Sequence, residues 1–379
     1  MNSDKARQPH KIVHVAKMTS VAGMERHLLT LLPALKARGL NVHLWILVEA
    51  DKPLDAYAEE MRGLGVPAEQ IIIKRDFDPV LIWKLIRKIR RGAFDAVHTH
   101  LIHADLHGVV AARLARVRHI FFSAHNDDSF RRRLPVRLVQ AWLWRKVESG
   151  IAISEALRQF VISVEFAPPN KAYTVHYGLD PMTIKPATDA REALCRELGL
   201  EPGAVIIGSM CRLTRQKGIR YAIQAFREVI TLHPNAHYVI AGDGPLRETL
   251  KQEVQTAGLE AHIHFLGWRS DAHSLLAAFD VLLMPSLWEG FGLVALEAMA
   301  VARPIVASRV SALPEIVVDS ETGYLVAPAD PGPLAQCLNS LIAEPERRRQ
   351  LGDNGRQRLE STFSVDKMVE GTLKAYRLL

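Results

Sequence analysis

The 379-residue sequence contains few cysteines, and this limits the chemistry that it can support. Cys195, Cys211 and Cys337 lie far apart in the chain and show no paired spacing. Such an arrangement indicates neither a disulfide framework nor a zinc site built on cysteine. We therefore expect three reduced cysteines with structural roles.

Long hydrophobic runs are also missing. No stretch reaches the roughly 18 apolar residues of a membrane-spanning helix, and the longest candidates, such as Leu44–Val48, have the length of a strand. The first eleven residues are polar and lack the apolar core of a secretory signal. These features predict a cytoplasmic protein. A chain of 379 residues that is 48% hydrophobic suits two domains of ordinary size.

Positive charge is concentrated in the first half of the chain. Residues 1–180 carry 27 Lys and Arg against 18 Asp and Glu, and the whole chain has a net charge of +7. Residues 131–147 combine six basic side chains with Trp142 and Trp144, and residues 84–92 are similar in character. Two interpretations stay open, a solvated basic face over a packed core and a peripheral contact with the anionic inner face of the cell membrane. No nucleic-acid-binding module is recognisable, so we expect no nucleic-acid partner.

Short apolar runs alternate with amphipathic helical patterns along the whole chain. The expected strands cover residues 11–17, 41–48, 70–74, 94–100, 120–125, 204–210, 237–241 and 262–268. Strands that alternate with helices predict parallel sheets covered on both faces. In such sheets a ligand binds beyond the carboxyl ends of the strands.

The most informative stretch is Pro285–Ala300, where a buried strand turns into a helix. Gly290 and Gly292 allow a tight turn with uncovered backbone amides, and the first amides of the following helix lack partners within the helix. Such a turn can bind an anion. Glu289 and Glu297 flank it, and carboxylates beside an anion suggest that hydroxyl groups, as in a sugar, are bound there too. The alternative is an ordinary glycine-containing loop before a helix with two solvated glutamates.

The same residues carry a family resemblance. The sequence E-G-F-G-L-x-x-x-E, followed by A-M-A, resembles the E-x7-E motif of retaining glycosyltransferases of the GT-B fold, family 4 (glycosyl transferases group 1). The resemblance implies an α/β protein with two Rossmann-like domains whose parallel sheets face each other across a cleft. It places an acceptor-side domain at residues 1–180, joined by a last helix at 364–379, and a nucleotide-sugar-binding domain at 181–363.

The resemblance also assigns roles to particular residues. Arg212 and Lys217 match an R-x4-K pair that holds the donor diphosphate, and two cations there would stabilise a departing diphosphate without a metal. Glu289 would position the sugar, Glu297 would accept from the ribose hydroxyls, and His125 would contact the sugar from the first domain. The implied catalytic residues are His125, Glu289, Arg212 and Lys217. The implied donor-binding residues are Gly23, Arg212, Lys217, Gly242, Trp268, Glu289, Phe291, Gly292, Leu293 and Glu297.

Two patterns could suggest a metal site. Asp76 and Asp78 form a D-x-D sequence, but they lie between a strand and a helix that begins at Pro79, where aspartates are common turn and cap residues. His103 and His107 could share a helix face, but no acidic or thiol partner is spaced with them. We expect no metal and no cofactor other than the donor substrate.

These patterns together predict a retaining, metal-independent glycosyltransferase of hexosyltransferase type. It would transfer sugar from a nucleotide sugar, with a UDP-sugar favoured by the resemblance, to a glycan or lipid-linked acceptor in surface polysaccharide biosynthesis. Two rival functions stay open, a non-catalytic nucleotide-sugar-binding partner subunit and a GT-B nucleotide-sugar epimerase.

Overall fold

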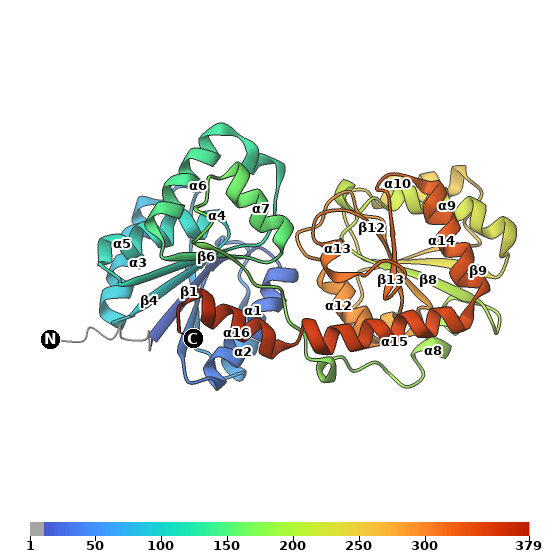
Figure 1. The fold of residues 1–379 in the computed structure, drawn as a ribbon, viewed down its shortest axis with the longest axis horizontal. Coiled ribbons are helices and arrows are strands. Elements are labelled where there is room, and N and C mark those ends of the chain that lie inside the picture. The colour runs from blue at the N-terminus through green and yellow to red at the C-terminus, as the bar shows by residue number, and fades with distance from the viewer. Residues whose placement is uncertain (1–10, 379) are drawn as a thin grey trace. The chain divides into compact units, whose positions relative to one another are not determined.

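The computed structural model describes residues 11–378, and the expectation about a signal at the very N-terminus lies outside them. The chain divides into two compact units, shown in Figure 1. The first unit comprises residues 1–178 and 365–379, and the second comprises residues 179–364. The final helix, α16 (Val365–Ala375), thus packs in the first unit, although the whole second unit lies between them in the sequence.

The first unit is built on a seven-stranded parallel sheet with the strand order β3-β2-β1-β4-β5-β6-β7. The strands are β1 (Lys11–Lys17), β2 (Asn41–Val48), β3 (Ala68–Ile72), β4 (Ala96–His100), β5 (His119–Ala124), β6 (Ser149–Ala152) and β7 (Ala172–Thr174). The helices are α1 (Gly23–Ala37), α2 (Asp55–Gly63), α3 (Pro79–Gly92), α4 (Ile102–Ala104), a π-helical turn (Asp105–Val109), α5 (Val110–Ala115), α6 (Leu134–Lys146), α7 (Glu155–Val164) and α16. Because β4 lies between β1 and β5, its five residues are all buried.

Helix α1 shows why the core of this unit forms where it does. Its leucines recur every three or four residues, so one face of the helix is apolar and packs on the sheet. Residues of α1, α2 and α16 share one buried cluster with β1 and β2. Right-handed crossovers place α3, α5, α6 and α7 on the opposite face of the sheet.

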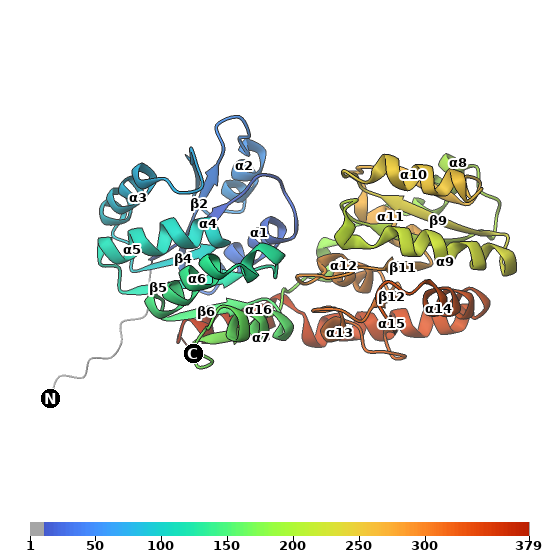
Figure 2. The same ribbon diagram turned by 90° about the horizontal axis from the view of Figure 1, so that it is seen from above.

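The second unit is built on a six-stranded parallel sheet with the order β10-β9-β8-β11-β12-β13, seen from a second direction in Figure 2. The strands are β8 (Val205–Met210), β9 (Ala236–Ala241), β10 (Ile263–Gly267), β11 (Val281–Met284), β12 (Ile305–Ser308) and β13 (Gly323–Val326). The helices are α8 (Ala190–Leu198), α9 (Ile219–Leu232), α10 (Arg247–Thr256), α11 (Ala272–Ala278), α12 (Leu293–Ala300), α13 (Leu313–Ile316), α14 (Pro331–Ala343) and α15 (Pro345–Thr362). Both units therefore have the parallel α/β architecture that the alternating pattern predicts.

The basic and aromatic segment at residues 131–147 is partly buried and partly exposed. Trp142 is 44% exposed, but Trp144 is fully buried and its ring packs edge-on against Phe122. Arg131 is buried as well and forms an ion pair of 2.7 Å with Glu165. Arg131 and Trp144 are therefore part of the packed core and not available for a surface contact, whereas Trp142 is. Among the described helices, none is both long enough and apolar enough to cross a membrane.

Candidate active site

An ion pair marks the carboxyl edge of the second sheet. Lys217 lies in the loop that follows β8, and its Nζ is 2.5 Å from Oε2 of Glu289, which lies in the loop that follows β11. The Ser286 hydroxyl donates to the same Oε2 at 3.3 Å, and the Glu289 backbone N–H donates to Oγ of Ser311. Only 7% of Glu289 is exposed, so the pair holds its carboxylate in one orientation.

Gly218 allows these two loops to meet. It has a φ of +62°, and a Cβ at this position would lie 2.0 Å from the carbonyl oxygen of Pro285. No residue with a side chain could bring the Lys217 loop so close to the loop after β11. Gly242 has a comparable role, because its φ is +127° and a Cβ would lie 1.9 Å from the carbonyl oxygen of Cys211. The structure thus gives Gly242 a packing function, whereas its predicted contact with a donor stays a prediction.

Helix α12 begins directly beside the ion pair. Gly292 is its N-cap residue with a φ of +98°, and no side chain caps the helix. The Phe291 side chain is buried against Phe363, so only backbone atoms of this residue could contribute to binding. Glu297 lies further along α12 and is 5% exposed. The first amides of α12, including that of Leu293, therefore come directly after the loop that carries Glu289. They have no partner within the helix and could bind an anion.

A small pocket adjoins Lys217 and runs between the ends of β8 and β11. Its lining residues are Ser209, Met210, Cys211, Lys217, Ile219, Leu283, Met284, Pro285, Ser286 and Val294. Burial raises the pKa of the Cys211 thiol to about 12, so this sulfur stays protonated and is a poor nucleophile.

The remaining predicted residues of this unit lie at the surface. Arg212 is exposed at the end of β8, and its guanidinium makes no ion pair within residues 11–378. Trp268 follows β10 and is 76% exposed, so its indole does not lie in the core.

The predicted residues of the first unit lie at the carboxyl edge of its own sheet. Gly23 begins α1, and the Glu25 carboxylate accepts a hydrogen bond from the Ala22 backbone N–H at 2.9 Å. His125 directly follows β5 and is 7% exposed. Its Nδ1 is 2.7 Å from the Tyr177 hydroxyl, and its Nε2 is 2.9 Å from Nδ1 of His100. Burial holds the pKa of His125 well below its usual range, so the ring is neutral.

The structure reveals partners of His125 that sequence reasoning missed. His14 on β1 lies opposite His98 on β4 in the sheet register, and His100 is on the same face of β4. All three are fully buried. His98 and His100 alternate in one expected strand, and this pattern indicates that both lie on one face of the sheet. The sequence gives no indication that His14 and Tyr376 contact these two histidines.

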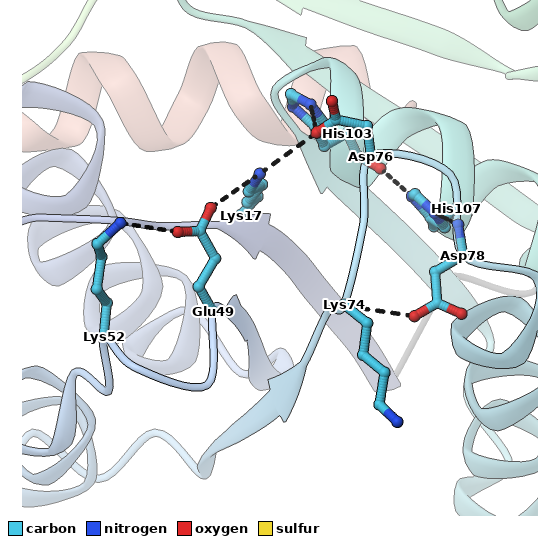
Figure 3. A network of polar contacts seen from close by, with 8 residues as sticks. All are labelled: Lys17, Glu49, Lys52, Lys74, Asp76, Asp78, His103 and His107. Atoms are coloured by element: carbon cyan, nitrogen blue, oxygen red, sulfur yellow. Dashed lines mark hydrogen bonds and ion pairs between the residues drawn. The ribbon is translucent and has the colours of Figure 1, made fainter.

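Figure 3 shows the polar network at this edge and explains the two patterns that could suggest a metal. Asp78 is the N-cap of α3, where its carboxylate accepts from the backbone N–H groups of Val80 and Leu81. Nε2 of His107 accepts from the Asp78 backbone N–H at 2.9 Å, and its Nδ1 donates to the His103 carbonyl oxygen. Both ring nitrogens of His107 are thus engaged, and Nε2 of His103 lies 3.1 Å from Oδ1 of Asp76, an acidic partner that the sequence spacing did not indicate.

Comparison with known proteins assigns the family. A family model described as "Glycosyl transferases group 1" matches residues 190–358, and one described as "Glycosyltransferase Family 4" matches residues 21–182. The alpha-maltose-1-phosphate synthase of Mycolicibacterium smegmatis is 31% identical over 310 residues, which are 75% of this chain and 79% of that protein. The chain belongs to glycosyltransferase family 4.

Two further comparisons extend over almost the whole glycosyltransferase. The Escherichia coli enzyme named UDP-Gal:alpha-D-GlcNAc-diphosphoundecaprenol alpha-1,3-galactosyltransferase is 28% identical over 375 residues, which are 95% of each chain. The crystal structure of HepE from Anabaena, in complex with UDP and glucose, superposes with a TM-score of 0.84. That comparison covers 98% of this chain and 100% of HepE at 22% identity, and it shows that the glycosyltransferase has the GT-B fold.

Proposed function

We propose that this glycosyltransferase moves a hexose from a nucleotide sugar to a glycan or lipid-linked acceptor, with retention of configuration and without a metal. The observation that carries the proposal is the pair of Lys217 and Glu289 at the carboxyl edge of the second sheet, beside the start of α12. A cation, a fixed carboxylate and the positive end of a helix lie together there. A diphosphate bonded to a hydroxyl-rich sugar needs these three elements.

The arrangement suggests how the donor is held. A diphosphate would compete with Glu289 for Lys217, and exposed Arg212 would supply a second cation from the same loop. Once Lys217 turns to the phosphate, the Glu289 carboxylate is free to accept from sugar hydroxyls. Two cations and the α12 amides offset the charge on the departing diphosphate, which removes the need for a bound metal.

Retention is proposed from the resemblance of the motif from Glu289 to Glu297 to that of retaining glycosyltransferases. The Cys211 thiol, whose pKa burial raises to about 12, is a poor nucleophile, and the proposal uses the Glu289 carboxylate to bind sugar hydroxyls and not to attack the sugar. The proposed reaction therefore proceeds on one face of the sugar, where the leaving phosphate accepts the proton of the attacking hydroxyl.

The proposed substrates follow from the relatives. HepE is described in complex with UDP and glucose, and the name of the E. coli relative specifies UDP-galactose and a diphosphoundecaprenol-linked acceptor. We therefore propose a UDP-sugar donor and an acceptor of surface polysaccharide synthesis.

A membrane-bound acceptor would suit the exposed apolar and basic side chains of the first unit. Trp83 on α3 is 54% exposed with the Arg87 guanidinium over its ring, and Trp142 on α6 is 44% exposed with the Lys146 ammonium over its ring. Flotation with vesicles of anionic and of neutral lipids tests this contact. We expect Trp83→Glu and Trp142→Glu to reduce binding to anionic vesicles, whereas Leu232→Glu, at an exposed site of the second unit, should not. Equal binding by all variants would contradict the membrane contact.

The donor site is tested by thermal unfolding in the presence of different nucleotides. UDP at 100 times its Kd should stabilise the wild-type protein by about 2.7 kcal/mol. Lys217→Ala should lose most of this effect, whereas Lys251→Ala, on exposed α10, should keep it. A full effect of UDP on Lys217→Ala would contradict the assignment.

The rival functions differ in what the purified chain does with a UDP-sugar. A transferase consumes donor only when an acceptor is present, an epimerase isomerises donor alone, and a non-catalytic subunit binds it without change. The anomeric configuration of the product, read by NMR, then tests retention.

A further inference from the structure

Seven buried side chains of the first unit form one continuous series of hydrogen bonds, which we call the histidine chain. In order, its members are Tyr177, His125, His100, His14, Tyr376, His98 and Ser123. All seven are at most 7% exposed. The histidine chain joins residues of β1, β4 and β5 to Tyr376, which directly follows α16. Its two tyrosines, Tyr177 and Tyr376, are nearly 200 residues apart in the sequence.

The bonds within the chain run head to tail. His125 uses Nδ1 toward Tyr177 and Nε2 toward His100, and His100 uses Nδ1 toward His125 and Nε2 toward His14. The two links between imidazole nitrogens are each 2.9 Å long. His14 then reaches the Tyr376 hydroxyl at 3.5 Å, and that hydroxyl bonds Nδ1 of His98, whose Nε2 is 2.8 Å from Oγ of Ser123. Each imidazole therefore uses both of its ring nitrogens within the chain.

Burial keeps these imidazoles neutral. It lowers the pKa of His14 to about 3, and it holds the pKa of His98 and of His100 well below the usual range. A neutral imidazole has one N–H donor and one acceptor nitrogen. Two neighbouring rings therefore cannot choose their tautomers independently, because two donors or two acceptors would otherwise face each other. The bonds along His125, His100 and His14 therefore all point in one direction or all in the other, whereas the Tyr376 hydroxyl, which can donate one bond and accept two, couples this segment to His98 less strictly.

A metal site is a weaker explanation of the same histidines. The ring nitrogens of His14, His98 and His100 include a set within 4.8 Å of one another. Their nitrogens already form hydrogen bonds with one another, with the hydroxyls of Tyr376 and Ser123, and with His125. The histidine chain also contains no carboxylate to offset a buried divalent charge. Packing alone would be served by apolar side chains, which carry no cost for unmade hydrogen bonds.

From this geometry we infer that His14, His100 and Tyr376 are positioning residues that set the tautomer of His125. The tautomer decides whether Nδ1 of His125 donates a hydrogen bond to the Tyr177 hydroxyl or accepts one from it. The same choice would apply to a sugar hydroxyl that replaced the Tyr177 hydroxyl as the partner of Nδ1. The position of Tyr376, which directly follows α16, thus biases a polar group at the carboxyl edge of the sheet. The kinetic consequence of this inference depends on the proposed function, but the tautomer itself does not.

The test measures the tautomers in the full-length protein without donor or acceptor. Long-range proton–nitrogen NMR spectra of protein with ¹⁵N-labelled histidine distinguish a protonated from an unprotonated ring nitrogen, and a His125→Gln variant assigns the His125 signals. In the wild type we expect one tautomer for each of the four histidines, with the same direction for His125, His100 and His14. Tyr376→Phe keeps the ring that stacks on Phe121 but removes the hydroxyl, so both ring nitrogens of His125 should move toward values that average the two tautomers.

Tyr57→Phe is the matched control. Tyr57 is a buried tyrosine of the same unit, and its hydroxyl donates to the Glu25 carbonyl oxygen outside the chain. It should leave the His125 signals unchanged. If Tyr376→Phe does not fold, Ser123→Ala cuts the chain at the other side of His98 with a smaller loss of volume. Changes confined to His14 and His98, or bound metal at one equivalent in the purified wild type, would overturn the inference.

Kinetics separate this inference from the proposed function. If both hold, Tyr376→Phe should lower kcat about tenfold or more with an unchanged KM for donor, because a misoriented tautomer impairs the transition state more than binding. A shift of the His125 signals without any transferase activity in the wild type would support the chain and contradict the function. Transferase activity in the wild type, with His125 signals that Tyr376→Phe leaves unchanged, would support the function and contradict the inference about the histidine chain.

Discussion

At the scale of single residues, the proposed donor site depends on one oxygen atom of Glu289. Its Oε2 accepts from both Lys217 and Ser286, so two neighbouring groups hold the carboxylate. In the proposed function, a ligand phosphate displaces this carboxylate from Lys217 before the carboxylate turns to a sugar. The carboxylate and the diphosphate would then compete for Lys217.

Glu289→Gln should separate binding from transfer. The amide keeps the shape of the side chain but no longer attracts Lys217 as an anion, so UDP should bind as tightly as to the wild type or several-fold more tightly. Transfer should fall about a hundredfold, because a neutral amide stabilises the positively charged, ring-flattened sugar of the transition state less well. Titration calorimetry with UDP and initial-rate kinetics measure the two effects.

Glu253→Gln provides the comparison for this variant. Glu253 pairs with Arg220 at the surface of the same unit, and the loss of that exposed pair should change neither quantity. A Glu289→Gln enzyme with the full wild-type kcat would exclude the proposed role of the carboxylate.

Contacts between the predicted site residues could not be read from the sequence. The family resemblance pointed to Lys217 and Glu289, but their ion pair spans 72 positions and only the folded structure shows it. The histidine chain could not be predicted, because the link from His14 to Tyr376 spans 362 positions and nothing local in either segment indicates a partner. Local sequence patterns show the periodicity of helices and strands. Hydrogen bonds between distant residues depend instead on the order of strands in the sheet and on the packing of α16 in the first unit.

At the scale of elements, the local patterns were informative where one period dominates. The expected strands at 11–17 and 41–48 coincide with β1 and β2, whereas the expected strand at 70–74 is found at Ala68–Ile72. Periodicity could also have placed Trp142 and Trp144 correctly. Residues two apart in a helix point about 200° from each other, so these two indoles cannot face the same side.

Gly218→Ala should disturb the active-site loops, and Gly199→Ala is its matched control. The two glycines have nearly the same φ, +62° and +63°, but a Cβ on Gly199 would meet nothing within 4 Å. Gly199→Ala should therefore cost only the roughly 1–2 kcal/mol of left-handed backbone. Gly218→Ala should cost about 2 kcal/mol more, because its Cβ overlaps the Pro285 carbonyl.

Thermal or urea unfolding measures these costs, and UDP binding shows whether the clash reaches the site. Movement of the loop should separate Lys217 from Glu289 and weaken UDP binding in Gly218→Ala alone. Equal destabilisation by the two substitutions would show that the approach to Pro285 has no energetic consequence.

At the scale of the whole molecule, the two units differ in the number of histidines that burial keeps neutral. The first unit contains His14, His27, His98, His100 and His125, all with a strongly lowered pKa. In the second unit the lowered values belong to His237, with a pKa of about 4, and to His264, and both rings are only partly buried. A fall in pH should therefore destabilise the first unit more than the second.

The direction of this effect follows from proton uptake. Below pH 6.5 the unfolded first unit binds protons at these histidines while the folded unit does not, so its stability falls as the pH falls. At pH 5, His14 and His27, each with a folded pKa of about 3, contribute a loss of about 2 kcal/mol each. His98, His100 and His125 add losses of the same sign, so the total is a large part of the stability of a typical domain. Asp105 acts in the opposite direction, since burial raises its pKa to about 8, and it offsets the loss from roughly one histidine.

We therefore expect the first unit to unfold between about pH 6.5 and pH 5 while the second unit stays folded. Hydrogen exchange followed by mass spectrometry, corrected for the intrinsic effect of pH, should show loss of protection in β1, β4 and β5 before β8 and β11. His27→Phe provides a check, because Nδ1 of His27 is buried without a hydrogen-bond partner within residues 11–378 and the ring stacks on Tyr177. Replacing it removes one proton-binding site of the unfolded state and should shift the transition to lower pH. Simultaneous loss of protection in both units would mean that the buried histidines do not determine the acid stability of the first unit.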